Sequence, residues 1–182
     1  TPIPGCAVFY PCDAPSAEAC VETMAQHEGM AYIRTTRPAT PVLYQKGEKF
    51  PVGGSKVIKK SGEDKALIVA AGITVFEALK AYEELKSKKI SIRIMDAFCI
   101  KPVDQTGLIE NAEKTGNKVV VVEDHYPSGG LGSAVSQALA GKADIIHLAV
   151  KSLPRSGKPE ELLDKYGISA DHIIEAVEKL NY

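Results

Sequence analysis

The chain has 182 residues, 45% of them hydrophobic and 25% charged, which is typical of a soluble globular protein. Its formal net charge of −1 provides no field that would favour nucleic acid or an acidic membrane as a partner. No apolar run approaches the roughly 20 residues that span a bilayer. The four cysteines have no metal-like spacing, and we expect them to be reduced thiols of a cytosolic protein.

Residues 1–44 predict the end of an α/β domain whose beginning is missing. Apolar runs predict three short strands, at residues 7–10, 30–34 and 42–44. Pro15 lies near the first turn of a predicted helix over residues 15–27. These elements make a thin core, and the chain lacks an initiator Met and a signal peptide. We therefore expect a piece cut or processed from a longer protein.

Residues 45–55 have the polar, glycine-containing composition of a linker, and residues 56–182 predict a complete α/β domain. The predicted strands are residues 56–59, 66–71, 92–95, 118–122 and 145–150. The predicted helices are residues 74–87, 104–115 and 131–140 and a closing helix that starts at Ser169. Alternating strands and helices imply a three-layer αβα fold with a mainly parallel, about five-stranded sheet. Its entry strand, 56–59, is placed antiparallel at an edge.

Two helix starts carry capping signals. Thr74 and Glu77 fit a capping box, in which Thr74 bonds forward and Glu77 bonds back. Asp104 fits the N-cap of the next helix.

The segment from Glu123 to Gly132 follows a buried strand and opens a helix, and three interpretations compete for it. A phosphate could bind at the helix N-terminus, but the two acidic residues would repel it, and the glycine pattern is not a Walker loop. His125 beside an acid could be catalytic, although an Asp-His dipeptide is weak support. From chemistry alone, glycines that permit a tight turn and close packing are the favoured interpretation.

Arg37 is the most specific candidate binding residue. It follows a predicted strand and two threonines, and precedes Pro38, which favours an extended backbone. A guanidinium grips phosphate in a bidentate way, yet a salt bridge at a strand end is the favoured interpretation from the residues alone. Among four isolated histidines, His147 interrupts an apolar strand as a hydrogen-bonded core residue would, and only His125 merits a test.

Seven stretches, in order, resemble the C-terminal portion of transketolase, most closely the animal-type enzymes. They are VFYPCDAPSAEACV, MAYIRTTRP, AAGITVFEALKAYEELK, RIMDAFCIKPVD, VEDHYPSGGLGSAVSQAL, HLAVKSLPRSGKPEELL and YGISADHIIEAV. The resemblance covers almost the whole chain, and the colinear series carries it. It implies that residues 1–44 end the pyrimidine-binding domain, 45–55 form the linker, and 56–182 form the C-terminal domain.

The resemblance also implies a function. Transketolase is a cytoplasmic homodimeric transferase of the pentose phosphate pathway that moves a two-carbon ketol unit between sugar phosphates, using thiamine diphosphate and Mg²⁺. RTTRP resembles the segment whose second arginine, here Arg37, binds the substrate phosphate, and Arg34 is then structural. The family's Gly-Asp-Gly segment and activating glutamate are absent. This implies no catalytic, cofactor-binding or metal-binding residue here and an inactive isolated segment.

Three alternatives remain open. Deoxyxylulose-phosphate synthase and the β subunits of 2-oxoacid dehydrogenases share the C-terminal architecture, but RTTRP and SLPRSGKPEELL look more like transketolase. A non-catalytic dimerisation or regulatory module would dimerise without affinity for sugar phosphates. A nucleotide-binding domain would use the loop at residues 128–132.

Overall fold

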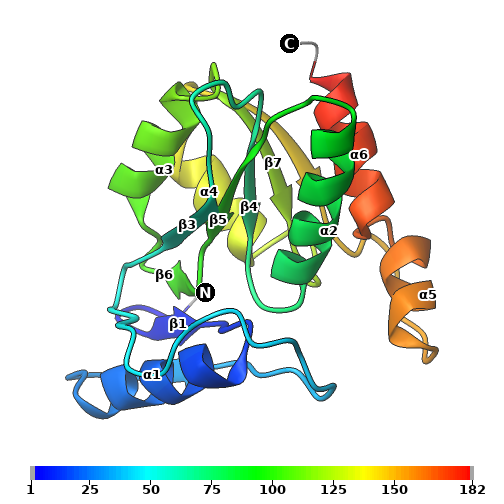
Figure 1. Cartoon of the computed structure of the whole chain (residues 1–182). Helices are drawn as coiled ribbons and strands as arrows, with labels where there is room; N and C mark the ends of the chain where they lie inside the picture. The colour runs from blue at the N-terminus through cyan, green and yellow to red at the C-terminus, as the bar shows by residue number, and fades with distance from the viewer. Residues whose placement is uncertain (1–2, 181–182) are drawn as a thin grey trace.

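The computed structural model describes residues 3–180, which form an α/β protein (Figure 1). The strands in these residues are β1 (Ala7–Phe9), β2 (Ala31–Ile33), β3 (Lys56–Lys59), β4 (Leu67–Ala70), β5 (Arg93–Asp96), β6 (Cys99–Lys101), β7 (Lys118–Val122) and β8 (Asp144–Leu148). The helices are α1 (Ala14–Ala25), α2 (Thr74–Ser87), α3 (Gln105–Glu113), α4 (Leu131–Ala138), α5 (Pro159–Lys165) and α6 (Ala170–Lys179).

A five-stranded sheet, in the order β3-β5-β4-β7-β8, forms the centre of the molecule. Its strands β5, β4, β7 and β8 are parallel, and β3 pairs antiparallel with β5 at one edge. Helices α2 and α6 cover one face, and α3 and α4 cover the other (Figure 1). The predicted three-layer αβα fold with a mainly parallel sheet is confirmed.

The central strands β4 and β7 are apolar throughout their buried length because helices cover both faces of the sheet. Successive side chains point to opposite faces. Ile68 and Val120 therefore join the core under α2 and α6, whereas Val69 and Val121 join the core under α3 and α4.

A second, three-stranded sheet has the order β2-β1-β6. Strand β1 pairs parallel with β2 and antiparallel with β6, a strand that the sequence did not predict. The Tyr10 amide also donates to the Phe98 carbonyl at 2.8 Å. Backbone hydrogen bonds thus join residues 1–44 to the segment after the expected linker. The division into 1–44, 45–55 and 56–182 stays a prediction.

The strand predicted at residues 42–44 is wrong, since this stretch has no strand pairing. Its amide groups donate to a side chain instead: the N–H groups of Leu43 and Tyr44 lie 2.7 and 2.8 Å from Asp13 Oδ2. The carboxylate takes the place that a neighbouring strand would have filled.

The predicted capping box at α2 is also wrong, because Ile73 is the N-cap and makes no side-chain cap. The Thr74 hydroxyl lies 2.9 Å from the Ala71 carbonyl and 3.0 Å from the Val122 carbonyl, so it bridges β4 and β7. Glu77 accepts from the Ala170 amide at 2.9 Å and so fixes the start of α6. By contrast, the predicted cap at α3 is confirmed, with Asp104 accepting from the Gly107 amide at 2.8 Å.

Candidate functional site

The candidate site lies where the strand order reverses. Strand β4 is followed along the chain by β5 on one side, whereas β7 pairs with the other side of β4. In open α/β sheets, the crevice beyond the carboxyl ends of two such strands is the usual place for a ligand. Here the crevice lies between the turn at Gly72 and the connection at residues 123–130.

Tyr10 fills this crevice from the second sheet. A Cβ on Gly72 would lie 2.0 Å from Tyr10 Cζ, so only glycine lets the ring pack there. The Tyr10 hydroxyl donates to Asp124 Oδ2 at 3.0 Å. Burial, followed by the nearby Asp124 carboxylate, raises the pKa of Tyr10, which keeps the phenol protonated as a donor.

Asp124 forms a two-pronged ion pair with Arg34, which follows β2. The Arg34 Nη2 atom lies 2.7 Å from Asp124 Oδ2, and Nη1 lies 3.2 Å from both Oδ1 and the Asp124 carbonyl. The guanidinium carbon is 4.6 Å from the centre of the Tyr10 ring. Such a fork–fork pair fixes geometry as well as charge, which is the structural kind of role expected for Arg34.

Glu123 occupies the N-terminus of α4. Its Oε2 accepts from the Leu131 amide at 2.7 Å and its Oε1 from the Gly132 amide at 2.9 Å. His147 Nε2 also lies 2.7 Å from Oε1, so His147 is the hydrogen-bonded histidine that was predicted. A Cβ on Gly130 would lie 2.0 Å from Glu123 Oε2. The carboxylate therefore fills the place that a bound phosphate would need, which favours the structural interpretation of the glycines.

His125 does not pair with the acid beside it. Its Nδ1 lies 2.9 Å from the Tyr126 carbonyl oxygen, and its ring is exposed. The Asp124 carboxylate turns instead toward Arg34 and Tyr10. The acid–histidine arrangement that general-base catalysis would need is not formed.

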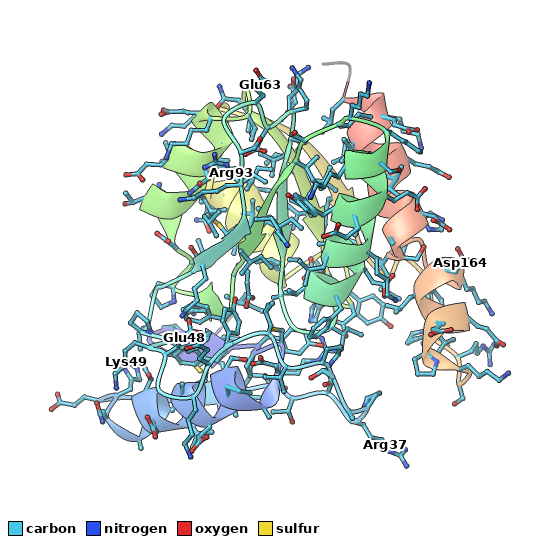
Figure 2. All side chains as sticks on the ribbon, viewed as in Figure 1. Arg37, Glu48, Lys49, Glu63, Arg93 and Asp164 are labelled. Carbon is cyan, nitrogen blue, oxygen red and sulfur yellow. The ribbon has the colours of Figure 1, made fainter. Side chains whose placement is uncertain are left out.

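Arg37 lies in the irregular segment after β2. The residue is exposed, and Figure 2 shows its side chain extending away from the body of the molecule. Within residues 3–180, its guanidinium has no hydrogen bond or ion pair. The salt bridge considered from the sequence is not formed, and all the guanidinium donors are available to a ligand.

A cavity of about 630 Å³ adjoins the Arg34–Asp124 pair. Its walls come from the β7–α4 connection, α5 and the segment before α5, and they include His125, Tyr126, Arg155, Leu162 and Tyr166. The Arg155 amide donates to the Tyr166 hydroxyl at 2.7 Å, which fastens the segment before α5 to that helix.

The groups at the crevice, among residues 3–180, can be compared in their chemistry with the cofactor that the resemblance implies. Within residues 3–180, no three His, Cys, Asp or Glu side chains are placed to hold a metal ion. The N-terminus of α4 at the crevice is taken by Glu123. These residues do not fit a magnesium-bound diphosphate.

The sequence indicated the segment from Glu123 to Gly132, but it did not indicate Tyr10 or the pairing of Asp124 with Arg34. Tyr10 stands at the end of an apolar run, where an aromatic residue is ordinary core. Asp124 and Arg34 are 90 positions apart, so no local spacing reports their contact. The acidic pair at the carboxyl end of a buried strand marked one side of the site, but it did not identify the partners of Asp124.

Comparison with known proteins agrees with this geometry. The family described as "Transketolase, C-terminal domain" matches residues 54–173. Transketolase-like protein 1 of Bos taurus is 51% identical over 180 residues, and transketolase of Homo sapiens is 46% identical over 180 residues. Both alignments cover 98% of this chain. The chain belongs to the transketolase C-terminal domain family.

A solved structure supports the fold. The chain matches a split-gene transketolase, described as an inactive beta4 tetramer, with a TM-score of 0.89 and 35% identity. The match covers 98% of this chain and 58% of that one. By contrast, the chain spans only 30% of the bovine relative and 29% of the human relative. No helix within residues 3–180 has both the length and the apolar character needed to cross a bilayer.

Proposed function

We propose that this chain is the C-terminal portion of a transketolase, a cytoplasmic transferase of the pentose phosphate pathway. The intact enzyme would move a two-carbon ketol unit from a ketose phosphate to an aldose phosphate. Colinear similarity to transketolases along nearly the whole chain supports this function. The proposal extends to a homodimer as the intact form.

The residue that this segment would contribute is Arg37, as a binding group for the substrate phosphate. The observation that carries this role is an exposed guanidinium with no partner among the described residues, on a segment held at both ends. A guanidinium forms paired, charge-assisted hydrogen bonds with phosphate oxygens. A structural arginine would instead lie against a carboxylate, as Arg34 does.

Thiamine diphosphate and Mg²⁺ would supply the carbanion chemistry of the intact enzyme. Because the residues of this chain do not fit them, we assign no step of that chemistry to it. We expect the isolated 182-residue segment to be inactive. The description of the structural relative as an inactive tetramer is consistent with this expectation.

The test is Arg37→Ala in the full-length enzyme, assayed with D-fructose 6-phosphate and D-fructose, which differ only in the phosphate. Losing a charge-assisted pair of hydrogen bonds costs about 1.5–3 kcal/mol, so kcat/KM for the phosphorylated ketose should fall roughly 10- to 100-fold. The value for D-fructose should change less than about twofold, within 0.4 kcal/mol.

Lys151→Ala is the control, since it removes another exposed positive charge from the same chain, away from the cavity walls. It should leave both substrates unaffected. Equal losses on the two ketoses in the Arg37→Ala enzyme would contradict phosphate binding by Arg37. A full-length protein that turns over neither ketose would contradict the transferase itself.

A further inference from the structure

The segment that carries Arg37 is attached at both of its ends by carboxylates from other elements. We call residues 34–44 the Arg37 loop. Between its ends it contains neither helix nor strand, and most of its residues are at least partly exposed. The position of Arg37 in space therefore depends in part on these two attachments.

Asp124 makes the first attachment, at Arg34. The ion pair has two short contacts, and the Asp124 side chain is only 13% exposed, so solvent screens it less than an ordinary surface pair. Tyr10 adds a hydrogen bond to the same carboxylate. The Arg34 amide also donates to the Phe9 carbonyl at 3.0 Å, which continues the β2 pairing.

Asp13 makes the second attachment, at residues 43 and 44. One carboxylate oxygen accepts the amides of Leu43 and Tyr44, and the other accepts the Ser16 amide at 2.9 Å. Asp13 is 4% exposed. Its burial tends to raise the pKa, but donation from Ser16, Tyr44 and Leu43 outweighs burial, and the pKa is lowered. The carboxylate thus stays ionised at neutral pH, and both of its oxygens remain hydrogen-bond acceptors.

The two attachments belong to different parts of the chain. Asp13 caps α1 in the N-terminal segment, whereas Asp124 belongs to the β7–α4 connection of the large sheet. The Arg37 loop is therefore held partly by the domain that matches the family's C-terminal domain.

We propose that Asp124 and Asp13 are positioning residues that hold the Arg37 loop in place, so that the C-terminal domain contributes to recognition of the substrate phosphate through Asp124. This inference rests on the proposed function. A loop fixed before binding loses less conformational freedom when the phosphate arrives, which strengthens binding without any new contact.

The experiment uses Asp124→Asn in the full-length enzyme, again with D-fructose 6-phosphate and D-fructose. The amide keeps the shape of the carboxylate but removes its charge and one acceptor for Arg34. We expect KM for D-fructose 6-phosphate to rise roughly 5- to 20-fold, with kcat within about twofold and D-fructose unaffected. Asp144→Asn is the matched control, since Asp144 is exposed and has no side-chain partner within the described residues.

A double-mutant cycle separates positioning from a general structural effect. In the Arg37→Ala background, Asp124→Asn should raise KM for D-fructose 6-phosphate less than about twofold, because the group that Asp124 positions is gone. Equal effects in both backgrounds, or equal losses on both ketoses, would overturn the proposal. If Asp124→Asn does not yield folded enzyme, Arg34→Gln breaks the same pair from the loop side and should give the same selective rise in KM.

The outcomes also separate this inference from the proposed function. If Arg37→Ala discriminates between the two ketoses but Asp124→Asn and Arg34→Gln do not, the positioning role alone is overturned. If Arg37→Ala itself shows no discrimination, phosphate binding by Arg37 fails and the positioning role fails with it.

Discussion

At the scale of the residue, Asp96 shows how burial changes an acid. It is completely buried at the end of β5, where Oδ2 accepts from the Tyr44 hydroxyl at 2.8 Å and from Cys12 Sγ at 3.6 Å. Its Oδ1 has no hydrogen-bond partner among residues 3–180. Burial raises the pKa of Asp96 to about 7, although the hydrogen bonds from Tyr44 and Cys12 lower it.

This pKa predicts a pH dependence of stability. The folded chain holds the Asp96 proton up to about pH 7, whereas the ordinary value is 3.8, so the free energy of unfolding falls as the pH rises between these values. Asp96→Asn removes this contribution. In urea denaturation, the free energy of unfolding of the variant relative to that of the wild type should rise by up to about 1.4 kcal/mol per pH unit from pH 5 to pH 7. Above pH 7 this difference should level off. Asp144→Asn should show no such trend, and a pH-independent gain for Asp96→Asn would contradict the prediction.

At the scale of the element, α4 depends on a side chain outside itself. Its N-cap is Gly130, which has no side chain to accept a hydrogen bond, and Glu123 from the end of β7 accepts two of the free amides instead. The helix is thereby fastened to the strand before it. The small residues at its start are required because a Cβ on Gly132 would lie 2.0 Å from His147 Nε2.

Glu123→Gln tests this attachment. The glutamine amide presents a donor where the carboxylate presented an acceptor, so one of the buried amides of Leu131 and Gly132 is left unpaired. We expect a loss of about 1–3 kcal/mol in the free energy of unfolding, measured in urea. Glu113→Gln, an exposed change in α3, is the control and should cost less than about 0.5 kcal/mol. Equal losses would show that Glu123 is not the cap.

The sequence predicted those elements whose burial is evident from the pattern of their own residues. The valine run at 119–122 predicted a strand, because a strand that is buried on both faces is apolar throughout. Strand β6 was missed because its partner β1 is about ninety residues away, and the false strand at 42–44 arose because Asp13 satisfies its amides. For the same reason, the Arg34–Asp124 pair could not be predicted. The role of Arg37 came from family resemblance and stays a prediction.

At the scale of the whole molecule, the N-terminal segment and the large domain share one core. The Phe50 ring packs edge-on against Tyr44 on one side and Phe98 on the other, with centroids 4.9 and 4.7 Å apart. Phe9 belongs to the same buried cluster as Ile94 of the large sheet. Together with the β1–β6 pairing, these contacts couple the two parts of the chain.

We therefore predict that residues 3–180 unfold as one cooperative unit, although the division at residues 45–55 would allow two. Hydrogen exchange followed by mass spectrometry across a urea series should give the same midpoint for peptides from β1 and from β7. Phe98→Ala removes a fully buried ring at the shared core and should lower both urea midpoints together. The expected loss in the free energy of unfolding is about 3–5 kcal/mol. An earlier midpoint for the β1 peptides, with β7 unaffected by Phe98→Ala, would show that the N-terminal segment unfolds on its own. In that case Asp124 could not transmit the stability of the large domain to the Arg37 loop, because the loop would detach first.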